Sequence, residues 1–201
     1  MSDILNPNNL PPSFGDENAL EEFMTRPSQE LIDDLGTLDG DIMVLGVGGK
    51  MGPTLARLAN RAAPDKKIIG VARFSEPDLP EKLADWGIET IKADLMDRDV
   101  LANLPKPKNV IFMAGRKFGS TGSEELTWAM NVHCPALVAE AFHKSRIVSF
   151  STICVYPFTT VSSGGSTEKE PPNPPGEYAQ SCVGRERMFQ HFSNQFYALY
   201  K

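Results

Sequence analysis

A glycine-rich loop directly after an apolar run constrains this chain more than any other feature. Residues 42–45 are all apolar, residues 46–52 contain four glycines, and a segment of helical period follows from Met51 to Arg61. Glycine tolerates the positive φ of a tight turn and leaves main-chain N–H groups open to a phosphate, because it has no Cβ. With a second strand ending roughly twenty residues later, this order is typical of a dinucleotide-binding loop. A tight turn without a ligand is the alternative.

Apolar runs of strand length then alternate with segments of helical period. The strand candidates are residues 42–45, 68–71, 88–91, 110–113 and 147–150, and the helix candidates between them are 51–61, 81–86, 97–104 and 124–143. Pro135 should bend or interrupt the last helix. Most runs are apolar without alternation, which indicates a sheet covered on both faces. We therefore expect an α/β fold: a Rossmann-like doubly wound, mostly parallel sheet with helices on both faces.

Two segments follow from this organisation. Residues 1–40 read as an irregular N-terminal arm plus a packing helix that opens near Thr25 and ends at Gly36. Residues 41–201 form the dinucleotide-binding domain. Proline-rich stretches in the arm cannot propagate a helix or a strand ladder, because proline lacks the N–H group.

Composition excludes several classes of protein. The 26 acidic and 20 basic side chains give a net charge of −6, which argues against nucleic-acid and anionic-membrane partners. There is no apolar stretch of the ~20 residues that a spanning helix needs and no signal peptide, so we expect a cytoplasmic protein. The odd number of cysteines without a CxxC pair indicates reduced thiols. The three histidines lack metal-ligand spacing, and we expect no metal site.

The glycine spacing carries a resemblance. Gly46, Gly49 and Gly52 follow GxxGxxG, and over residues 41–200 the chain resembles the short-chain dehydrogenase/reductase superfamily, most of all its NAD-dependent epimerase/dehydratase branch. The resemblance implies a cofactor site that comprises Gly46, Gly48, Gly49, Lys50, Met51, Gly52, Arg73, Asp94, Leu95, Ala114 and Gly115. In that family Asp94-Leu95 would contact adenine, and Ala114-Gly115 would lie beside the nicotinamide ribose.

The residue after the second strand bears on which dinucleotide binds. Family members that use NAD usually carry an acidic residue there, whereas this chain has Arg73, and Lys50 adds a cation in the loop. A guanidinium can pair with a 2′-phosphate but cannot accept from a 2′-hydroxyl. We expect NADP as the cofactor, with NAD as the alternative. The alternative interpretation is that both cations are solvated charges on surface loops and bind no phosphate.

The catalytic residues that the resemblance implies are incomplete. Thr152 and Tyr178 match the family's hydroxyl residue and tyrosine, but Cys182 occupies the position of the lysine in YxxxK. A neutral thiol supplies no charge to stabilise a phenolate. Arg185 lies seven residues after Tyr178 on the same helix face, and we expect it to be too far away to replace that charge. Asn131 matches a structural asparagine of the family.

Two functions therefore remain open. One is an NAD(P)-dependent epimerase, dehydratase or reductase acting on a sugar or another carbonyl or alcohol substrate. The other is a non-catalytic NAD(P)-binding redox sensor or scaffold with a degenerate active site. Family members usually continue into a substrate lobe, whereas this sequence stops at Lys201. The sequence is thus a fragment of a longer protein, or a partner contributes the wall of its substrate site, or it has no substrate wall. A homo-oligomer is one arrangement in which a partner contributes that wall.

Overall fold

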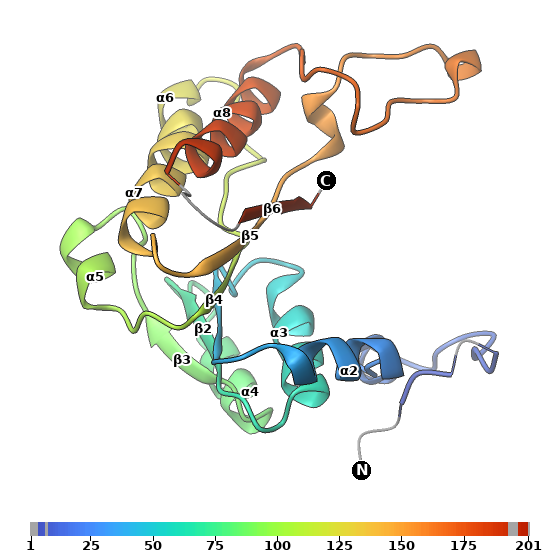
Figure 1. The fold of residues 1–201 in the computed structure, drawn as a ribbon. Helices are drawn as coiled ribbons and strands as arrows, with labels where there is room; N and C mark the ends of the chain where they lie inside the picture. The colour runs from blue at the N-terminus through green and yellow to red at the C-terminus, as the bar shows by residue number, and fades with distance from the viewer. Residues whose placement is uncertain (1–3, 7, 193–196, 201) are drawn as a thin grey trace. The chain divides into compact units, whose positions relative to one another are not determined.

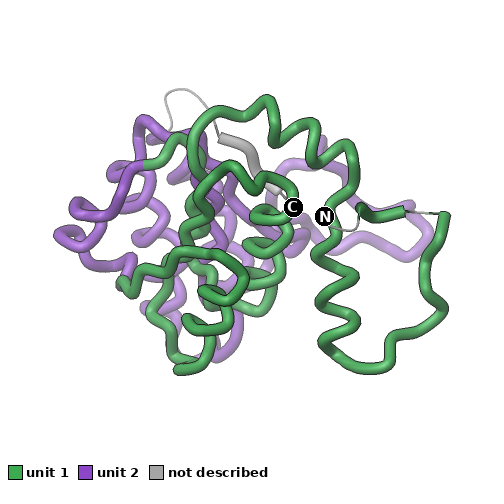
Figure 2. The backbone as a smooth tube through the Cα atoms, turned by 90° about the horizontal axis from the view of Figure 1, so that it is seen from below, with its two compact units in different colours: residues 1–93, 107–109 green, residues 94–106, 110–201 purple. Residues whose placement is uncertain are grey.

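The computed structural model describes residues 4–6, 8–192 and 197–200. These residues form two compact units, shown in different colours in Figure 2. Unit 1 comprises Met1–Ala93 and Pro107–Asn109, and unit 2 comprises Asp94–Lys106 and Val110–Lys201. Each unit is described by itself below.

Unit 1 is built on three parallel strands joined by helices (Figure 1). In chain order its elements are β1 (Ile42–Leu45), α3 (Gly52–Ala62), β2 (Ile68–Ala72), α4 (Leu79–Asp85) and β3 (Glu89–Lys92). The strands lie in the order β3-β2-β1, with Ile42 opposite Ile68 and Ile69 opposite Glu89. All four residues of β1 are buried, which explains why its sequence is apolar without alternation. This βαβαβ arrangement is half of a dinucleotide-binding fold.

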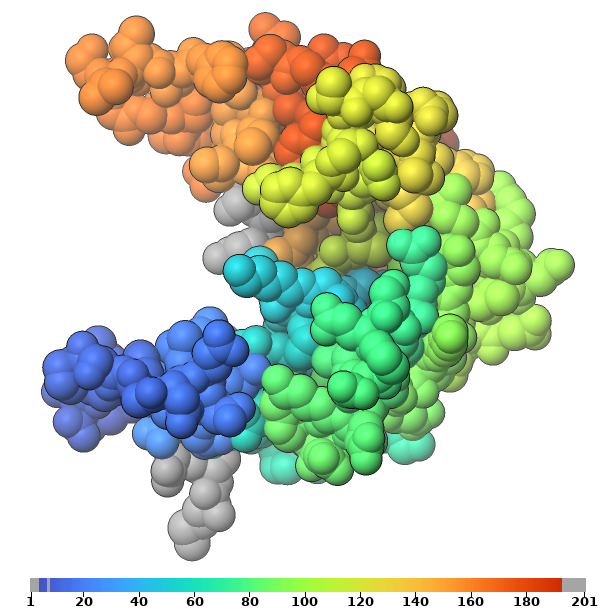
Figure 3. Space-filling model, turned by 180° about the vertical axis from the view of Figure 1, so that it is seen from behind, coloured from blue at the N-terminus to red at the C-terminus, as the bar shows by residue number. Residues whose placement is uncertain are grey.

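Two N-terminal helices, α1 (Glu17–Met24) and α2 (Gln29–Thr37), pack against α3. In the space-filling view the blue N-terminal residues lie against the cyan and green part of the same unit (Figure 3). The sequence analysis missed α1. It also placed the start of α2 too early, because Ser28 rather than Thr25 caps the helix and accepts a hydrogen bond from the N–H of Leu31.

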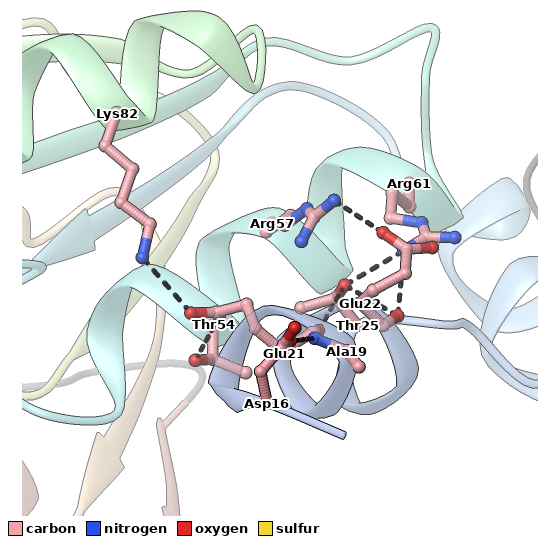
Figure 4. A network of polar contacts seen from close by, with 9 residues as sticks. All are labelled: Asp16, Ala19, Glu21, Glu22, Thr25, Thr54, Arg57, Arg61 and Lys82. Atoms are coloured by element: carbon pink, nitrogen blue, oxygen red, sulfur yellow. Dashed lines mark hydrogen bonds and ion pairs between the residues drawn. The ribbon is translucent and has the colours of Figure 1, made fainter. Parts of the chain in front are cut away.

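Ionic contacts join α1 to α3 and α4 (Figure 4). Glu22 pairs with Arg57 at 2.6 Å and with Arg61 at 2.9 Å. Glu21 accepts a hydrogen bond from the hydroxyl of Thr54 over 2.7 Å and pairs with Lys82 of α4 at 3.3 Å. The two adjacent carboxylates therefore hold the arm onto α3, the helix that follows the glycine loop.

Unit 2 contains the remaining strands and helices. Its elements are α5 (Arg98–Asn103), β4 (Asn109–Phe112, whose first residue belongs to unit 1), α6 (Glu124–Trp128), the π-helical turn η1 (Ala129–His133), α7 (Cys134–Ala141), β5 (Arg146–Phe150), the 3-10 turns η2 (Ile153–Val155) and η3 (Val161–Ser163), α8 (Glu177–Phe192) and β6 (Tyr197–Tyr200). The strands lie in the order β4-β5-β6, and β6 runs parallel to β5. The sequence analysis did not anticipate β6.

Pro135 interrupts the predicted helix over residues 124–143, as expected. It lies in the first turn of α7, immediately after η1. Proline cannot donate the N–H that would close an ordinary turn onto Asn131, and a π turn accommodates the lost bond. Asn131 consequently sits on a widened turn, where its side chain is fully buried.

The alternation of parallel strands with helices confirms the α/β, Rossmann-like fold. The five strand candidates agree with β1 to β5 within one residue at each end. No helix in the described part of the chain is both long enough and apolar enough to cross a membrane.

Candidate active site

The glycine loop of unit 1 connects the end of β1 to the start of α3. The amide N–H of Gly46 donates to the carbonyl of Val71 over 2.8 Å, and Gly46 has a φ of 91°, which favours glycine. A Cβ on Gly52 would overlap the carbonyl oxygen of Val47, so only glycine lets α3 begin this close to the loop. At Gly49, in contrast, a Cβ would make ordinary contacts and would stand on the exposed surface of the loop. This cradle fits the diphosphate of a dinucleotide.

The two cations predicted to select NADP are both exposed. Lys50 lies in the loop and Arg73 directly follows β2. A Cβ on Gly48 would lie 3.2 Å from the Cβ of Ala72, so the loop runs beside the end of β2 from which Arg73 projects. The next residue, Phe74, has a φ of 51°, a left-handed conformation that non-glycine residues adopt rarely. Strain of this kind gathers at ligand sites.

The other predicted cofactor residues lie in unit 2. The Asp94 carboxylate accepts a hydrogen bond from the N–H of Met96 over 3.0 Å, and Leu95 is buried. Ala114 and Gly115 follow the end of β4. A Cβ on Gly115 would overlap Nη2 of Arg185, so the main chain of this turn rests directly on that guanidinium.

Unit 2 brings the three predicted catalytic positions together. The phenol of Tyr178, in the first turn of α8, lies near enough to the side chains of Thr152 and Cys182 for both to act on its pKa. Thr152 precedes η2, and Cys182 is one helical turn after Tyr178 and fully buried. Cys182 packs with Val155 and Tyr156. The arrangement places a hydroxyl and a phenol side by side, as a carbonyl-binding pair requires.

Burial dominates the electrostatics of these groups. It raises the pKa of Tyr178 to about 12, to which the neighbouring Cys182 also contributes, while Thr152 and Arg185 act in the opposite direction. Burial likewise raises the pKa of the Cys182 thiol, and Arg185 opposes it. A raised pKa agrees with the expectation that a neutral thiol at position 182 gives the phenolate no stabilising charge, and the cost of ionising a half-buried phenol adds to it.

Arg185 lies on α8, seven residues after Tyr178. Its side chain is buried, with Nη2 donating to Oδ1 of Asn131 over 2.8 Å and Nη1 donating to the carbonyl of Phe150 over 3.1 Å. Among the groups that act on the pKa of Tyr178, Arg185 has the smallest effect and does not offset burial, which agrees with the expectation that it is too far away to replace the lysine. The partners that fix the guanidinium come from η1 and β5.

Asn131 is the hub of these contacts. Its Oδ1 also accepts from the N–H of Arg116 over 2.8 Å, and its Nδ2 donates to Arg116 O and to Ser181 Oγ, each over 2.9 Å. The predicted structural role of Asn131 in core hydrogen bonding is confirmed.

A pocket of about 840 Å³ opens beside Tyr178 in unit 2. Its walls come from the loop before α6, from η2, and from the long segment between η2 and α8, drawn in orange in Figure 1. The lining includes Ile153, Cys154, Tyr156, Phe158 and Tyr178. A small molecule that entered this pocket would meet the phenol of Tyr178.

Metal and disulfide chemistry have little support in the described residues. They contain no group of three histidine, cysteine, aspartate or glutamate side chains arranged to hold a metal ion. The three cysteines are free of disulfides in the described structure, and Cys134 and Cys182 are buried.

Comparison with known proteins agrees with this geometry. The model of the NAD dependent epimerase/dehydratase family matches residues 42–200. No curated protein gives a significant match.

Several solved structures share the fold at low sequence identity. The enzyme WbmG from Bordetella bronchiseptica, solved with NAD and UDP, is 20% identical with a TM-score of 0.66 over 81% of this chain and 52% of that one. The dTDP-4-dehydrorhamnose reductase from Bacillus anthracis, solved with NADP, is 16% identical with a TM-score of 0.63, covering 81% and 53%. The UDP-glucuronic acid 4-epimerase from Bacillus cereus, solved with NAD, is 17% identical with a TM-score of 0.63, covering 79% and 55%. The chain spans about half the length of these structures.

Proposed function

Because the chain belongs to the NAD-dependent epimerase/dehydratase family, we propose that it binds a nicotinamide dinucleotide and uses Tyr178 in a hydride-transfer reaction on a sugar or another carbonyl or alcohol substrate. The observation that carries the proposal is the proximity of Thr152, Tyr178 and Cys182, with Tyr178 lining a pocket. The glycine-rich loop over residues 46–52 supports the proposal that a dinucleotide binds. NADP is the proposed form, because the exposed Arg73 stands where an acidic residue would serve NAD, and Lys50 adds a second exposed cation in the glycine loop.

The chain's own residues would perform the proton chemistry. A bound nicotinamide supplies or accepts a hydride at the substrate carbon. Thr152 would hold the substrate oxygen by a hydrogen bond. Tyr178 would donate its phenolic proton to that oxygen during carbonyl reduction and take it back during alcohol oxidation. With a pKa of about 12, the phenol is protonated at neutral pH, which favours its role as the acid.

A non-catalytic dinucleotide-binding protein is the second candidate. The observation that favours it is Cys182, whose fully buried thiol stands at the position of the family's lysine. A sensor or scaffold would keep the glycine cradle and would turn over no substrate. We propose a cytoplasmic location for either function.

Turnover separates the two candidates. Wild type is mixed with NADPH or NADH and a panel of aldehydes, ketones and keto sugars, and the loss of nicotinamide absorbance is followed. Tyr178→Phe should lower the rate at least about a hundredfold, because it removes the proton donor and keeps the ring. Dinucleotide binding without turnover on any substrate would favour the sensor.

A further inference from the structure

The pocket beside Tyr178 has charged walls of one sign. Its described lining residues include three glutamates and no lysine, arginine or histidine. Glu124 comes from α6, Glu168 from the loop between η3 and α8, and Glu177 from the first turn of α8. All three belong to unit 2, so the sign of the charge is a property of that unit. Charges of one sign around a hollow reinforce one another's field inside it.

The three carboxylates keep their charge. The amide N–H of Gly122 donates to Glu124 over 2.9 Å and holds the pKa of that carboxyl below its usual value. Glu177 accepts a hydrogen bond from Nε1 of Trp128, which is a neutral donor. Glu168 is exposed to solvent. In the described part of the chain no lysine or arginine forms an ion pair with any of the three, so their charge is not neutralised.

Neighbouring cations of the same segments stay outside the lining. Arg116 donates to the carbonyl of Gly119 over 2.8 Å, and the ammonium of Lys117 lies 5.5 Å from the centre of the Phe118 ring. Lys169 directly follows a lining glutamate, but it is exposed and is not among the described residues that line the pocket. None of these cations therefore offers a negatively charged group a partner within the pocket.

The rest of the lining suits an uncharged molecule. Hydroxyls of Thr121, Thr159 and Ser166 can exchange hydrogen bonds with the alcohol groups of a substrate. The rings of Tyr156 and Phe158 supply apolar surface. A volume of about 840 Å³ is within the range of pockets that hold small molecules. Neither a hydroxyl nor an aromatic ring compensates a phosphate or a carboxylate as a lysine or an arginine does.

We propose that the substrate group held in this pocket is uncharged or carries an ammonium group, and that the pocket repels phosphate and carboxylate groups. The proposal deepens the proposed function, on which it rests for the role of Tyr178. It names the substrate class as a neutral or amine-bearing carbonyl or alcohol compound, such as a free sugar or an amino sugar. Selectivity of this kind comes from repulsion of the wrong group as much as from attraction of the right one. The UDP in the structure of WbmG carries phosphates, which this pocket would repel.

The thiol of Cys154 provides a probe within the pocket. It is exposed and lines the pocket, whereas Cys134 and Cys182 are buried. The full chain is treated with three methanethiosulfonates of similar size, which carry a trimethylammonium, a hydroxyl or a sulfonate group. Mass spectrometry follows the labelling of Cys154, and each rate is divided by the rate of the same reagent with free cysteine, which removes intrinsic reactivity. Cys154→Ser identifies labelling at the other thiols.

The cationic reagent should react fastest, with a corrected rate at least about tenfold above that of the anionic reagent. Glu168→Gln should lower this ratio at least about twofold, and adding Glu124→Gln and Glu177→Gln should lower it further. Glutamine keeps an acceptor oxygen for the two donors described above. Glu125→Gln is the matched control, because Glu125 is an exposed glutamate of α6 that is not among the described lining residues. This variant removes the same charge and should leave the ratio close to that of wild type.

Equal corrected rates of the cationic and anionic reagents in wild type would overturn the proposal. It would also be overturned by a ratio that falls equally in Glu168→Gln and Glu125→Gln, or by a thiol that even the neutral reagent does not reach. If the triple variant does not fold, Glu168→Gln decides alone. Because labelling needs neither dinucleotide nor turnover, failure here is distinct from failure of the proposed function, which NADPH binding and turnover by wild type test separately.

Discussion

Oδ1 of Asn131 accepts hydrogen bonds from both Nη2 of Arg185 and the main-chain N–H of Arg116, each over 2.8 Å. One amide oxygen thus ties α8 to the segment that follows β4. The π turn before Pro135 carries this amide, so an interruption of the helix also fixes the guanidinium. The consequence is a preformed cationic centre in unit 2, one turn beyond the thiol that replaces the family's lysine.

Restoring that lysine should strengthen the site. Cys182→Lys places an ammonium next to the phenol of Tyr178, and we expect this charge to lower the pKa of the phenol by about one unit. The phenolate fraction at pH 8, and with it the rate of alcohol oxidation, should then rise about tenfold. Initial rates at saturating cofactor measure this. Cys182→Met is the control, because it adds a long side chain without charge. An equal rise in both variants would show that volume rather than charge matters.

The pH dependence should differ between the two reaction directions. The pKa of Tyr178 is raised to about 12 mainly by burial, so the phenolate fraction grows about tenfold per pH unit throughout the range from 7 to 10. Oxidation, which needs the phenolate, should rise with that slope, whereas reduction, which needs the phenol, should stay flat. An oxidation rate that levels off near pH 7 would mean that a different base accepts the proton.

Arg73 should set the preference between the two dinucleotides. Arg73→Asp removes the partner of a 2′-phosphate and adds an acceptor for a 2′-hydroxyl, so the affinity for NADPH should fall at least about tenfold and that for NADH should be kept or improved. The ratio of the two dissociation constants measures the change. Lys144→Asp makes the same charge change at an exposed position after α7. A ratio that does not move in Arg73→Asp would place the selectivity elsewhere.

The N-terminal arm should contribute to stability through Glu22. Glu22→Gln weakens two ion pairs, with Arg57 and Arg61, whose side chains are only 20% and 16% exposed. We expect the free energy of unfolding in urea to fall by about 1 kcal/mol. Glu170→Gln, in an exposed loop, is the control. An unchanged urea midpoint in Glu22→Gln would show that the arm is held by its apolar contacts.

Local patterns predicted most of the fold. Strands β1 to β5 were found because each is a short apolar run between helical segments. The glycine loop was found because the tight turn into α3 requires glycine at particular positions. Helix α1 was missed because it is short and lies in a polar segment, and its carboxylates bind α3 residues more than thirty positions away. Strand β6 was missed because its pairing with β5 is a tertiary contact of a four-residue run.

The candidate site was predictable only as far as sequence positions match a family. Thr152, Tyr178 and Cys182 were named together from motif spacing, and the structure brings them close to one another, while their catalytic role stays a prediction. The pKa of Tyr178 was not predictable, since it depends on burial. The burial of Arg185 was not predictable either, because helix spacing does not reveal Asn131 and Phe150, which hold its side chain from other elements.

Binding of NADPH to the glycine loop tests the central claim most directly. A Cβ at Gly49 makes only ordinary contacts with the protein, yet it stands on the exposed face of the loop where a phosphate would approach. Titration calorimetry with NADPH should show binding to wild type, an affinity at least about tenfold lower for Gly49→Ala, and no change for Gly36→Ala, where nothing lies near the added carbon. Wild-type affinity in a folded Gly49→Ala, or no binding by wild type to either NADPH or NADH, would contradict the account.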